Sequence, residues 1–261
     1  MPTGEPYPGT QSVLRAIALL KTFSDEQPEL GLADLSRLVG LNKTTTYRLL
    51  TALESEGMVV RNADTETFRL GPEIIALGGR AMRANDLRLV SRAELERLAE
   101  AVGEAATLEV LADSEVLILE EISGSHLVST NQAIGTRWPA HATSTGKLIV
   151  AHLPEAELDE FLRQPLARLT EHTITDPTQL RLELTRIREQ GYAVADQEIE
   201  IGFIAIGAPV RNHEGQVVGA ISINGPTARL TSDRIPDVIR RVKFAADHIS
   251  GLLGCRPDGE L

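Results

Sequence analysis

Two short stretches of this 261-residue chain combine hydroxyl, amide and cationic side chains in a way that could bind a phosphate or another anion. The first begins at Asn42, a residue type that caps helices by accepting hydrogen bonds from free backbone N–H groups. Lys43, three consecutive threonines and Arg48 follow it. Short hydroxyls and a cation at a helix N-terminus suit contact with base edges and phosphates. We therefore predict that this helix enters the major groove of DNA.

Arginines on two later strand-like runs extend this prediction, because Arg61 and Arg69 could reach backbone phosphate or an adjacent minor groove. The predicted DNA-contacting residues are Asn42, Lys43, Thr44, Thr45, Thr46, Arg48, Arg61 and Arg69. The alternative is a small structural domain in which the threonines only cap and the arginines are solvated. We favour DNA binding, because the order of helices, the hairpin and the chemistry of the third helix coincide.

The second stretch is the Ser-Thr-Gly-Lys sequence at 144–147. It is not a Walker phosphate loop, since His141 occupies the place of the required first glycine and Leu148 follows the lysine. Small hydroxylated residues leading into a helix instead predict an anion-friendly pocket wall. Further along, Ser222 and Asn224 alternate with isoleucines and so share one face of their strand, where polar side chains need partners.

An enzymatic alternative can be built from His141 as base, Ser144 as nucleophile and Asp196 as the group that orients the histidine. Such a trio can be assembled by chance from almost any chain, and no nucleophile elbow, zinc-protease or dinucleotide-binding motif occurs. The remaining histidines show no metal-ligand spacing. We expect no catalytic residue, no metal and no cofactor. The alternatives kept open are a small-molecule hydrolase and a ligand-binding protein without DNA function.

The first stretch must be presented by helices, and apolar residues at helical spacing predict three short ones. The first is expected from Gln11 to near Ser24, the second over 32–40, and the third from just after Asn42 to a closing Gly57. Two strand-like runs, 58–61 and 67–70, follow around a polar turn. Three helices and a hairpin form the winged helix-turn-helix pattern.

After this unit, Gly71-Pro72 opens a helical stretch toward Asp86 that we interpret as a linker helix. The rest of the chain alternates strands and helices. Strands are predicted over 107–112, 115–122, 192–195, 204–210 and 217–223, and helices over 144–153, 155–162, 178–190 and 232–253. Locally paired strands with interspersed helices indicate an α+β domain with a mixed or antiparallel sheet.

Composition limits the class of protein. Apolar residues make up 42% of the chain, which is enough for a packed core, and the single cysteine, Cys255, excludes an internal disulfide framework. No apolar run is long enough to span a bilayer, and the N-terminus lacks a signal-peptide pattern, so we expect a cytoplasmic protein. The net charge of -11 argues at first sight against DNA, but it is a whole-chain sum, and the cations of the third helix cluster at its start. We therefore expect weak non-specific binding to DNA and an affinity that depends on the two DNA-binding units of a dimer acting together.

Several segments, in shared order and spacing, make the sequence resemble the IclR family of bacterial transcriptional regulators over residues 12–254. They are 12–20, 39–50, 135–147, Gly191-Tyr192, 196–198, Gly202, 208–210 and 221–226. The resemblance implies a GAF-like α+β effector domain that binds a small molecule, often a carboxylate or aromatic catabolite. It also implies a homodimer or homotetramer on pseudo-palindromic double-stranded operator DNA.

Carried across residue by residue, the resemblance implies an effector site and a division of the chain. The implied effector-binding residues are Trp138, Ser144, Thr145, Asp196, Phe203, Ala205, Ser222 and Asn224. Ala205 departs from relatives that have a thiol there, and Asn224 departs from the commoner serine, so the identity of the effector is not inherited. The expected parts are a flexible tail (1–10), the winged domain (11–71), the linker helix (72–87), the effector domain (88–254) and a second tail (255–261). Together they predict a ligand-responsive repressor of a catabolic operon that is not an enzyme and has no membrane partner.

Overall fold

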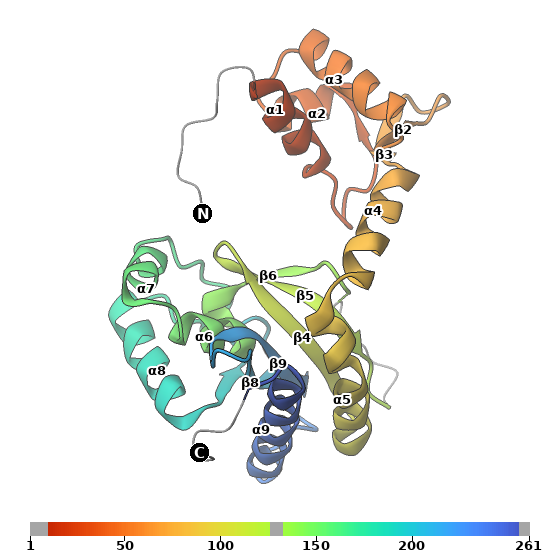
Figure 1. Ribbon diagram of the computed structural model, residues 1–261. Coiled ribbons are helices and arrows are strands. Elements are labelled where there is room, and N and C mark those ends of the chain that lie inside the picture. The colour runs from red at the N-terminus through yellow and green to blue at the C-terminus, as the bar shows by residue number, and fades with distance from the viewer. Residues whose placement is uncertain (1–9, 126–132, 256–261) are drawn as a thin grey trace. The chain divides into compact units, whose positions relative to one another are not determined.

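The computed structural model describes residues 10–125 and 133–255, and the chain divides into two compact units, 1–84 and 85–261 (Figure 1). Nearly all of both predicted tails lies outside the described residues. None of the helices within the described ranges is both long enough and apolar enough to cross a membrane. Each unit has its own apolar core and is described separately.

The first unit contains the three predicted helices and a small sheet. Its elements are α1 (Gln11–Leu20), β1 (Leu30–Gly31), α2 (Leu32–Leu38), α3 (Lys43–Ser55), β2 (Val59–Arg61), β3 (Thr67–Leu70) and α4 (Pro72–Arg83). The first helix is shorter than predicted, because Thr22 donates its side-chain hydroxyl to the carbonyl of Leu19 and ends it before Ser24. The two-residue strand β1 was not predicted, since so short a run has no periodicity to detect.

One apolar cluster holds this unit together. Leu19, Leu35, Leu50 and Phe68 are nearly inaccessible to solvent and bring α1, α2, α3 and β3 onto a common core. The sheet order is β1–β3–β2 and all pairings are antiparallel, with Arg61 opposite Phe68. The inward leucines of α3 therefore fix which of its faces points outward.

The second unit is larger and begins after a break in the chain's helical path. The stretch predicted as one linker helix over 72–87 is interrupted after Arg83, because the Asn85 side chain accepts a hydrogen bond from the backbone N–H of Arg88 and caps a new helix. The elements are α5 (Asp86–Val102), β4 (Ala105–Ala112), β5 (Glu115–Ile122), β6 (Arg137–Pro139), the 3₁₀ turn η1 (Ala140–Ala142), α6 (Ser144–Ala151), α7 (Glu155–Leu162), α8 (Pro177–Gln190), β7 (Ala193–Asp196), β8 (Phe203–Arg211), β9 (Val217–Pro226) and α9 (Ile235–Leu252).

A six-stranded antiparallel sheet in the order β6–β5–β4–β9–β8–β7 forms the middle of this unit. The helices α5 and α9 pack on one face, and α6 packs on the other, backed by α7 and α8 (Figure 1). This arrangement confirms the predicted α+β class with a mainly antiparallel sheet flanked by helices. The short edge strand β6 was not predicted from the sequence.

The N-terminus of α6 is held unusually close to the turn before it. The Thr143 side chain accepts a hydrogen bond from the backbone N–H of Gly146 at 2.9 Å and caps the helix. A Cβ atom at position 146 would lie 2.3 Å from the carbonyl oxygen of Ala140, so only glycine fits there. Gly146 of the Ser-Thr-Gly-Lys sequence therefore allows α6 to pack closely against η1.

Candidate DNA-binding surface and effector pocket

The predicted cap of the third helix is present. The Asn42 side chain accepts a hydrogen bond from the backbone N–H of Thr45 at 2.8 Å, and α3 starts at the next residue, Lys43. Lys43, Thr44 and Arg48 are exposed, and Thr45 is half-buried. The outward face of this helix therefore carries two cations and two hydroxyls within two turns.

Tyr47 belongs to the same face and was missed among the predicted contacts. Tyr47 is 45% exposed, so it is accessible to a partner. Its position, four residues after Lys43 and three after Thr44, places it beside both on the helix surface. The helical spacing alone was the signal that could have found it.

Thr46 does not lie with the other predicted DNA-contacting residues. Its side chain is inaccessible to solvent, and its hydroxyl donates to the backbone carbonyl of Asn42 at 3.1 Å. It shares the inner face of α3 with Leu50, four residues later, so packing rather than capping chemistry determines its position. A threonine facing the core has no access to a base or a phosphate.

The two wing arginines lie on opposite faces of the hairpin. Arg61 is paired with Phe68 across the strands, forms an ion pair with Glu66, and stacks with its guanidinium 5.9 Å from the centre of the Phe68 ring. Arg69 is paired with Val60, points to the other face, and is exposed. The Arg69 side chain is therefore accessible to a phosphate, whereas Arg61 would first have to break its ion pair with Glu66.

In the second unit, seven of the eight predicted effector-binding residues line one cavity. They are Trp138, Ser144, Thr145, Phe203, Ala205, Ser222 and Asn224. The strands β8 and β9 supply the floor, α6 supplies one wall and β6 contributes the tryptophan. The cavity has a volume of about 20 Å³, which is room for little more than one water molecule.

Asp196 is the predicted residue that the structure does not bring to this cavity. It is exposed at the end of β7, whereas the preceding residue, Ala195, lines the cavity. Successive side chains of a strand point to opposite faces, so the alternation that brings Ala195 inward turns Asp196 outward. Ile199, just beyond the strand, contributes to the lining instead.

Three polar atoms around the cavity are buried and make no hydrogen bond within the described part of the chain. They are the indole Nε1 of Trp138, the hydroxyl Oγ of Ser144 and the amide Oδ1 of Asn224. Buried polar groups are nearly always hydrogen-bonded in folded proteins, because leaving one unpaired costs about 1–3 kcal/mol. Unpartnered donors and acceptors around one small cavity are typical of a site that a ligand completes.

Glu109, on β4, is a pocket residue that the sequence reasoning missed. It lines the cavity and its side chain is fully buried, and burial raises the pKa of the carboxyl, an effect that hydrogen bonds from Thr145 and Thr107 partly oppose. The Thr145 hydroxyl donates to Oε2 at 2.6 Å and the Thr107 hydroxyl to Oε1 at 2.9 Å. Ser222 joins the same chain through a 2.8 Å hydrogen bond with Thr107.

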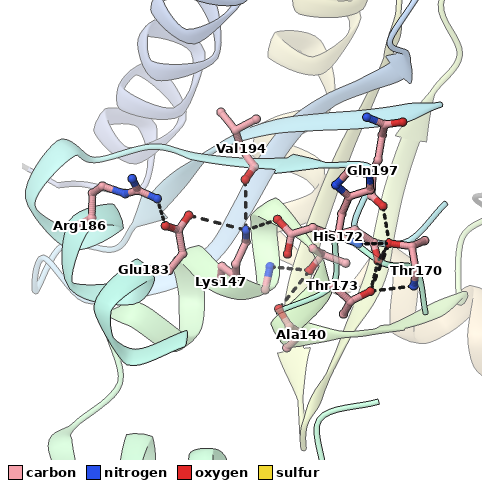
Figure 2. Close-up of polar contacts among 12 residues, drawn as sticks. Ala140, Lys147, Thr170, His172, Thr173, Glu183, Arg186, Val194 and Gln197 are labelled. Atoms are coloured by element: carbon pink, nitrogen blue, oxygen red, sulfur yellow. Dashed lines mark hydrogen bonds and ion pairs between the residues drawn. The ribbon is translucent and has the colours of Figure 1, made fainter. Parts of the chain in front are cut away.

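A buried ion pair anchors the helix that forms the pocket wall (Figure 2). Lys147 of α6 is only 1% exposed, and its Nζ lies 2.5 Å from Oε1 of Glu198, 3.1 Å from the carbonyl oxygen of Val194 and 3.8 Å from Glu183 of α8. Burial raises the pKa of Glu198, and the Lys147 ammonium opposes that shift. Lys147 thereby ties α6 both to α8 and to the loop that carries Ile199.

The loop that carries Glu198 is held from its other side by two threonines (Figure 2). Thr170 donates its hydroxyl to the carbonyl of Gln197 at 2.7 Å, and Thr173 donates to the carbonyl of Glu198, also at 2.7 Å. Backbone carbonyls that accept buried hydroxyls leave the loop little freedom. The ion pair and the two threonines therefore position the pocket wall, whereas Lys147, Glu198, Thr170 and Thr173 do not themselves line the cavity.

The hydrolase trio considered from the sequence is not assembled. The Nε2 of His141 is bonded to the carbonyl oxygen of Ala167 at 2.9 Å, and burial lowers the pKa of this imidazole. The Ser144 hydroxyl makes no hydrogen bond to it or to any other described residue. Since Asp196 points away from the cavity, neither the base nor the orienting group is in place.

A winged helix-turn-helix unit with a capped, cation-bearing third helix, followed by a domain with an incomplete polar pocket, defines a two-domain transcriptional regulator. Family comparison gives the same class and narrows it. The model for the IclR helix-turn-helix domain matches residues 12–63, and the model for the bacterial transcriptional regulator IclR C-terminal domain matches residues 79–251. The chain belongs to the IclR family of DNA-binding transcriptional regulators.

Individual relatives match over nearly their whole length. The HTH-type transcriptional regulator KipR of Bacillus subtilis is 35% identical over 245 residues, covering 94% of this chain and 97% of the relative. The transcriptional repressor IclR of Escherichia coli is 29% identical over 243 residues, covering 92% and 89%. A crystal structure of an IclR homologue from Microbacterium hydrocarbonoxydans complexed with 4-hydroxybenzoate is 30% identical, with a TM-score of 0.80, and covers 93% of this chain and 98% of that one. KipR and IclR are both named for transcriptional regulation.

Proposed function

We propose that this protein is a cytoplasmic, ligand-responsive repressor of a catabolic operon that senses a small carboxylate or aromatic metabolite. The observation that carries the DNA-binding part is the outward face of α3, where Lys43, Thr44, Tyr47 and Arg48 are all exposed behind an Asn42 cap. The similarity to a relative named as a repressor supports the direction of regulation. Enrichment of genomic DNA fragments by the protein would identify the operator.

In this proposal the start of α3 enters the major groove. Lys43 and Arg48 contact phosphate or guanine, Thr44 and Thr45 contact base edges or phosphate, and Asn42 orders the first turn. Arg69 binds the DNA backbone directly, and Arg61 does so after exchanging Glu66 for a phosphate. Thr46 is left out, because it faces the core.

We propose that the protein binds its operator as a homodimer or as a homotetramer built from dimers. Val13, Leu14 and Ile17 of α1 are 59%, 47% and 43% exposed, which is an unusual concentration of apolar surface on one short helix. Two copies that cover these side chains against each other would present two α3 helices to two half-sites about one helical turn, or a multiple of it, apart. Pseudo-palindromic operators follow from that symmetry.

The effector is proposed to enter the cavity beside α6. The unpartnered Trp138, Ser144 and Asn224 atoms support a polar ligand, and the relative bound to 4-hydroxybenzoate supports an aromatic acid as one candidate. Because the cavity now holds little more than one water molecule, a metabolite fits only an expanded form. The ligand therefore binds one conformation in preference to another, which is what coupling to operator affinity requires.

The experiment that tests the DNA-binding part is the Arg48→Ala variant. A DNA fragment is first enriched by the wild-type protein from a library of genomic fragments, and the variant is then titrated against it by fluorescence anisotropy. Loss of an exposed cation at the start of the recognition helix is expected to weaken binding by about tenfold or more, equivalent to about 1.4 kcal/mol or more.

The matched control is Arg240→Ala, which removes the same charge from an exposed position on α9. It is expected to leave DNA affinity within about twofold, because Arg240 is not one of the proposed DNA-contacting residues. Equal affinity of Arg48→Ala and wild type would refute the assignment of α3. An equal loss in both variants would mean that net charge, and not α3, determines binding.

A further inference from the structure

A buried acid in the pocket limits what the effector can be. Glu109 lines the cavity, and none of the ion pairs formed by the described residues includes it. The nearest cation along α6, Lys147, is directed away into its pair with Glu198. The side chains that bond to Glu109 are the hydroxyls of Thr107 on β4 and Thr145 on α6. A carboxyl without a counter-charge is unfavourable for an incoming anion and favourable for a hydrogen-bond donor.

The carboxyl retains capacity for a further donor. Each carboxylate oxygen can accept about two hydrogen bonds, and Glu109 uses one at Oε1 and one at Oε2. Thr107 is in turn hydrogen-bonded to Ser222, so hydroxyls from β4, β9 and α6 are arranged in a hydrogen-bonded chain that passes through the acid. This chain holds the carboxyl in a fixed orientation at the cavity wall.

Two other residues that line the cavity have the opposite preference. Ser144 is the first residue of α6, it is 1% exposed, and its hydroxyl has no partner within the described ranges. The buried indole N–H of Trp138 is also without a partner there. A donor hydroxyl at the start of α6 and a donor N–H from β6 favour an acceptor group such as a carboxylate. The lining of the cavity thus combines unpaired donors with a carboxyl.

We propose that the effector is a small organic acid that also carries a hydroxyl or amino group, and that Glu109 selects it by accepting a hydrogen bond from that group. The inference rests on the proposed effector pocket and specifies its ligand class. The acid group of the ligand lies toward Ser144 and Trp138, and the donor lies toward Glu109. An otherwise identical acid that lacks the donor leaves Glu109 facing an apolar atom, and sites built to bond a hydroxyl discriminate strongly against such analogues.

The test uses two matched sets of probes with the full-length protein. The first set is acetate, glycolate and glycine, and the second is benzoate, 4-hydroxybenzoate and 4-aminobenzoate. Within at least one set, the hydroxyl or amino acid is expected to bind at least about tenfold more tightly than the unsubstituted acid, measured by isothermal titration calorimetry. Equal affinity within both sets, or no binding by any member, would overturn the proposal.

Variants of the acid assign the preference to Glu109. Glu109→Leu is expected to abolish the preference for the donor-bearing acid. Glu109→Gln retains a carbonyl acceptor but no charge, so it is expected to keep a preference for the hydroxyl and to lose one for a cationic amine. A hydroxyl preference that survives in Glu109→Leu, or a preference for the cationic amine that survives in Glu109→Gln, would overturn the role of Glu109. The second outcome decides if Glu109→Leu fails to fold. Glu157→Gln, an exposed glutamate on α7, is the control and is expected to behave as wild type.

Binding of the enriched DNA fragment separates this inference from the proposed function. If ligands of either class alter DNA binding without any preference for a donor, regulation stands and the selectivity of Glu109 is refuted. If the preference is present but no fragment is bound, the pocket inference stands and the proposed operator binding is refuted.

Discussion

Glu109 carries a carboxyl whose ionisation is disfavoured because the surrounding protein excludes water from it, and burial raises its pKa above the ordinary value. Between the ordinary value near 4.5 and the raised value, the folded protein keeps a proton that the unfolded chain releases. The free energy of unfolding therefore falls as the pH rises through that window. The same carboxyl that would recognise a ligand thus lowers stability at neutral pH.

The Glu109→Gln variant tests this cost. Its amide keeps the shape of the acid and one acceptor oxygen but does not titrate, so it is expected to gain stability relative to wild type as the pH rises from 5 to 8, by about 1.4 kcal/mol for each unit by which the pKa is raised. Urea unfolding of both proteins at several pH values measures the difference. A constant difference across the range would show that Glu109 does not titrate in the window.

At the scale of elements, α6 connects the two chemical networks of the second unit. Its first residues, Ser144 and Thr145, face the cavity, and Lys147 one turn later is buried in the ion-pair network with Glu198. The position of the cavity wall therefore depends on how closely α6 packs against η1 and on the pairing of its lysine. Two substitutions separate these contributions.

The first substitution is Gly146→Ala. The added Cβ would lie 2.3 Å from the carbonyl oxygen of Ala140 and 2.5 Å from the Thr143 hydroxyl, so α6 must shift and the pocket must distort. We expect a loss of stability of about 1–3 kcal/mol, typical of overpacking, and loss of ligand binding, measured by urea unfolding and calorimetry. The control is Gly251→Ala in α9, where a Cβ meets nothing within 4 Å, and which is expected to stabilise by up to about 1 kcal/mol. Similar effects of both changes would contradict the close packing of α6.

The second substitution is Lys147→Met, which leaves the buried Glu198 carboxylate without its cation. Removing one partner of a buried ion pair typically costs about 3–5 kcal/mol, because the remaining charge is uncompensated. The double variant Lys147→Met with Glu198→Leu is expected to recover part of that loss. If chemical denaturation gave equal stabilities for the single and the double variant, the pair would not be the source of the effect.

At the scale of the whole molecule, charge is distributed unevenly between the two units. Residues 11–71 contain seven Lys or Arg and eight Asp or Glu, so the winged unit has a formal charge of only -1 out of -11. The exposed cations Lys43, Arg48 and Arg69 lie on α3 and β3, while Glu66 neutralises Arg61. A nearly neutral winged unit gives little general attraction to DNA, which is consistent with the proposal that two winged units of a dimer bind the operator together.

The salt dependence of operator binding measures how many phosphates are contacted. Three exposed cations in each of two heads would release about six counterions, which corresponds to a slope of about -5 in a plot of log K against log salt concentration. Titration of the enriched fragment at several KCl concentrations gives this slope, with random DNA as the control, for which we expect weak retention at physiological salt. A slope near -10 would require further phosphate contacts from outside this set.

The sequence by itself determined those features that depend on neighbours along the chain. The Asn42 cap, the inward leucines of α3 and the β8–β9 hairpin are set by residues within a few positions of one another, because capping and helical or strand periodicity are local. The resemblance added eight candidate effector-binding residues, seven of which line the cavity, since order and spacing in a family carry tertiary information that one sequence does not.

Only the tertiary structure decided which polar side chains are covered. Thr107 and Glu109 alternate with apolar residues on β4, a pattern typical of a strand with one face exposed to solvent. The helix α6, from much later in the chain, nevertheless covers that face and buries the acid. Likewise, helix packing directs the Thr46 side chain into the core, and strand alternation directs Asp196 to solvent. Arg61 forms an ion pair with Glu66. Whether a side chain is buried depends on which distant element packs on its face of the sheet. The proposed preference for a ligand with a donor group therefore follows only from the tertiary structure, in which α6 covers Glu109 on β4.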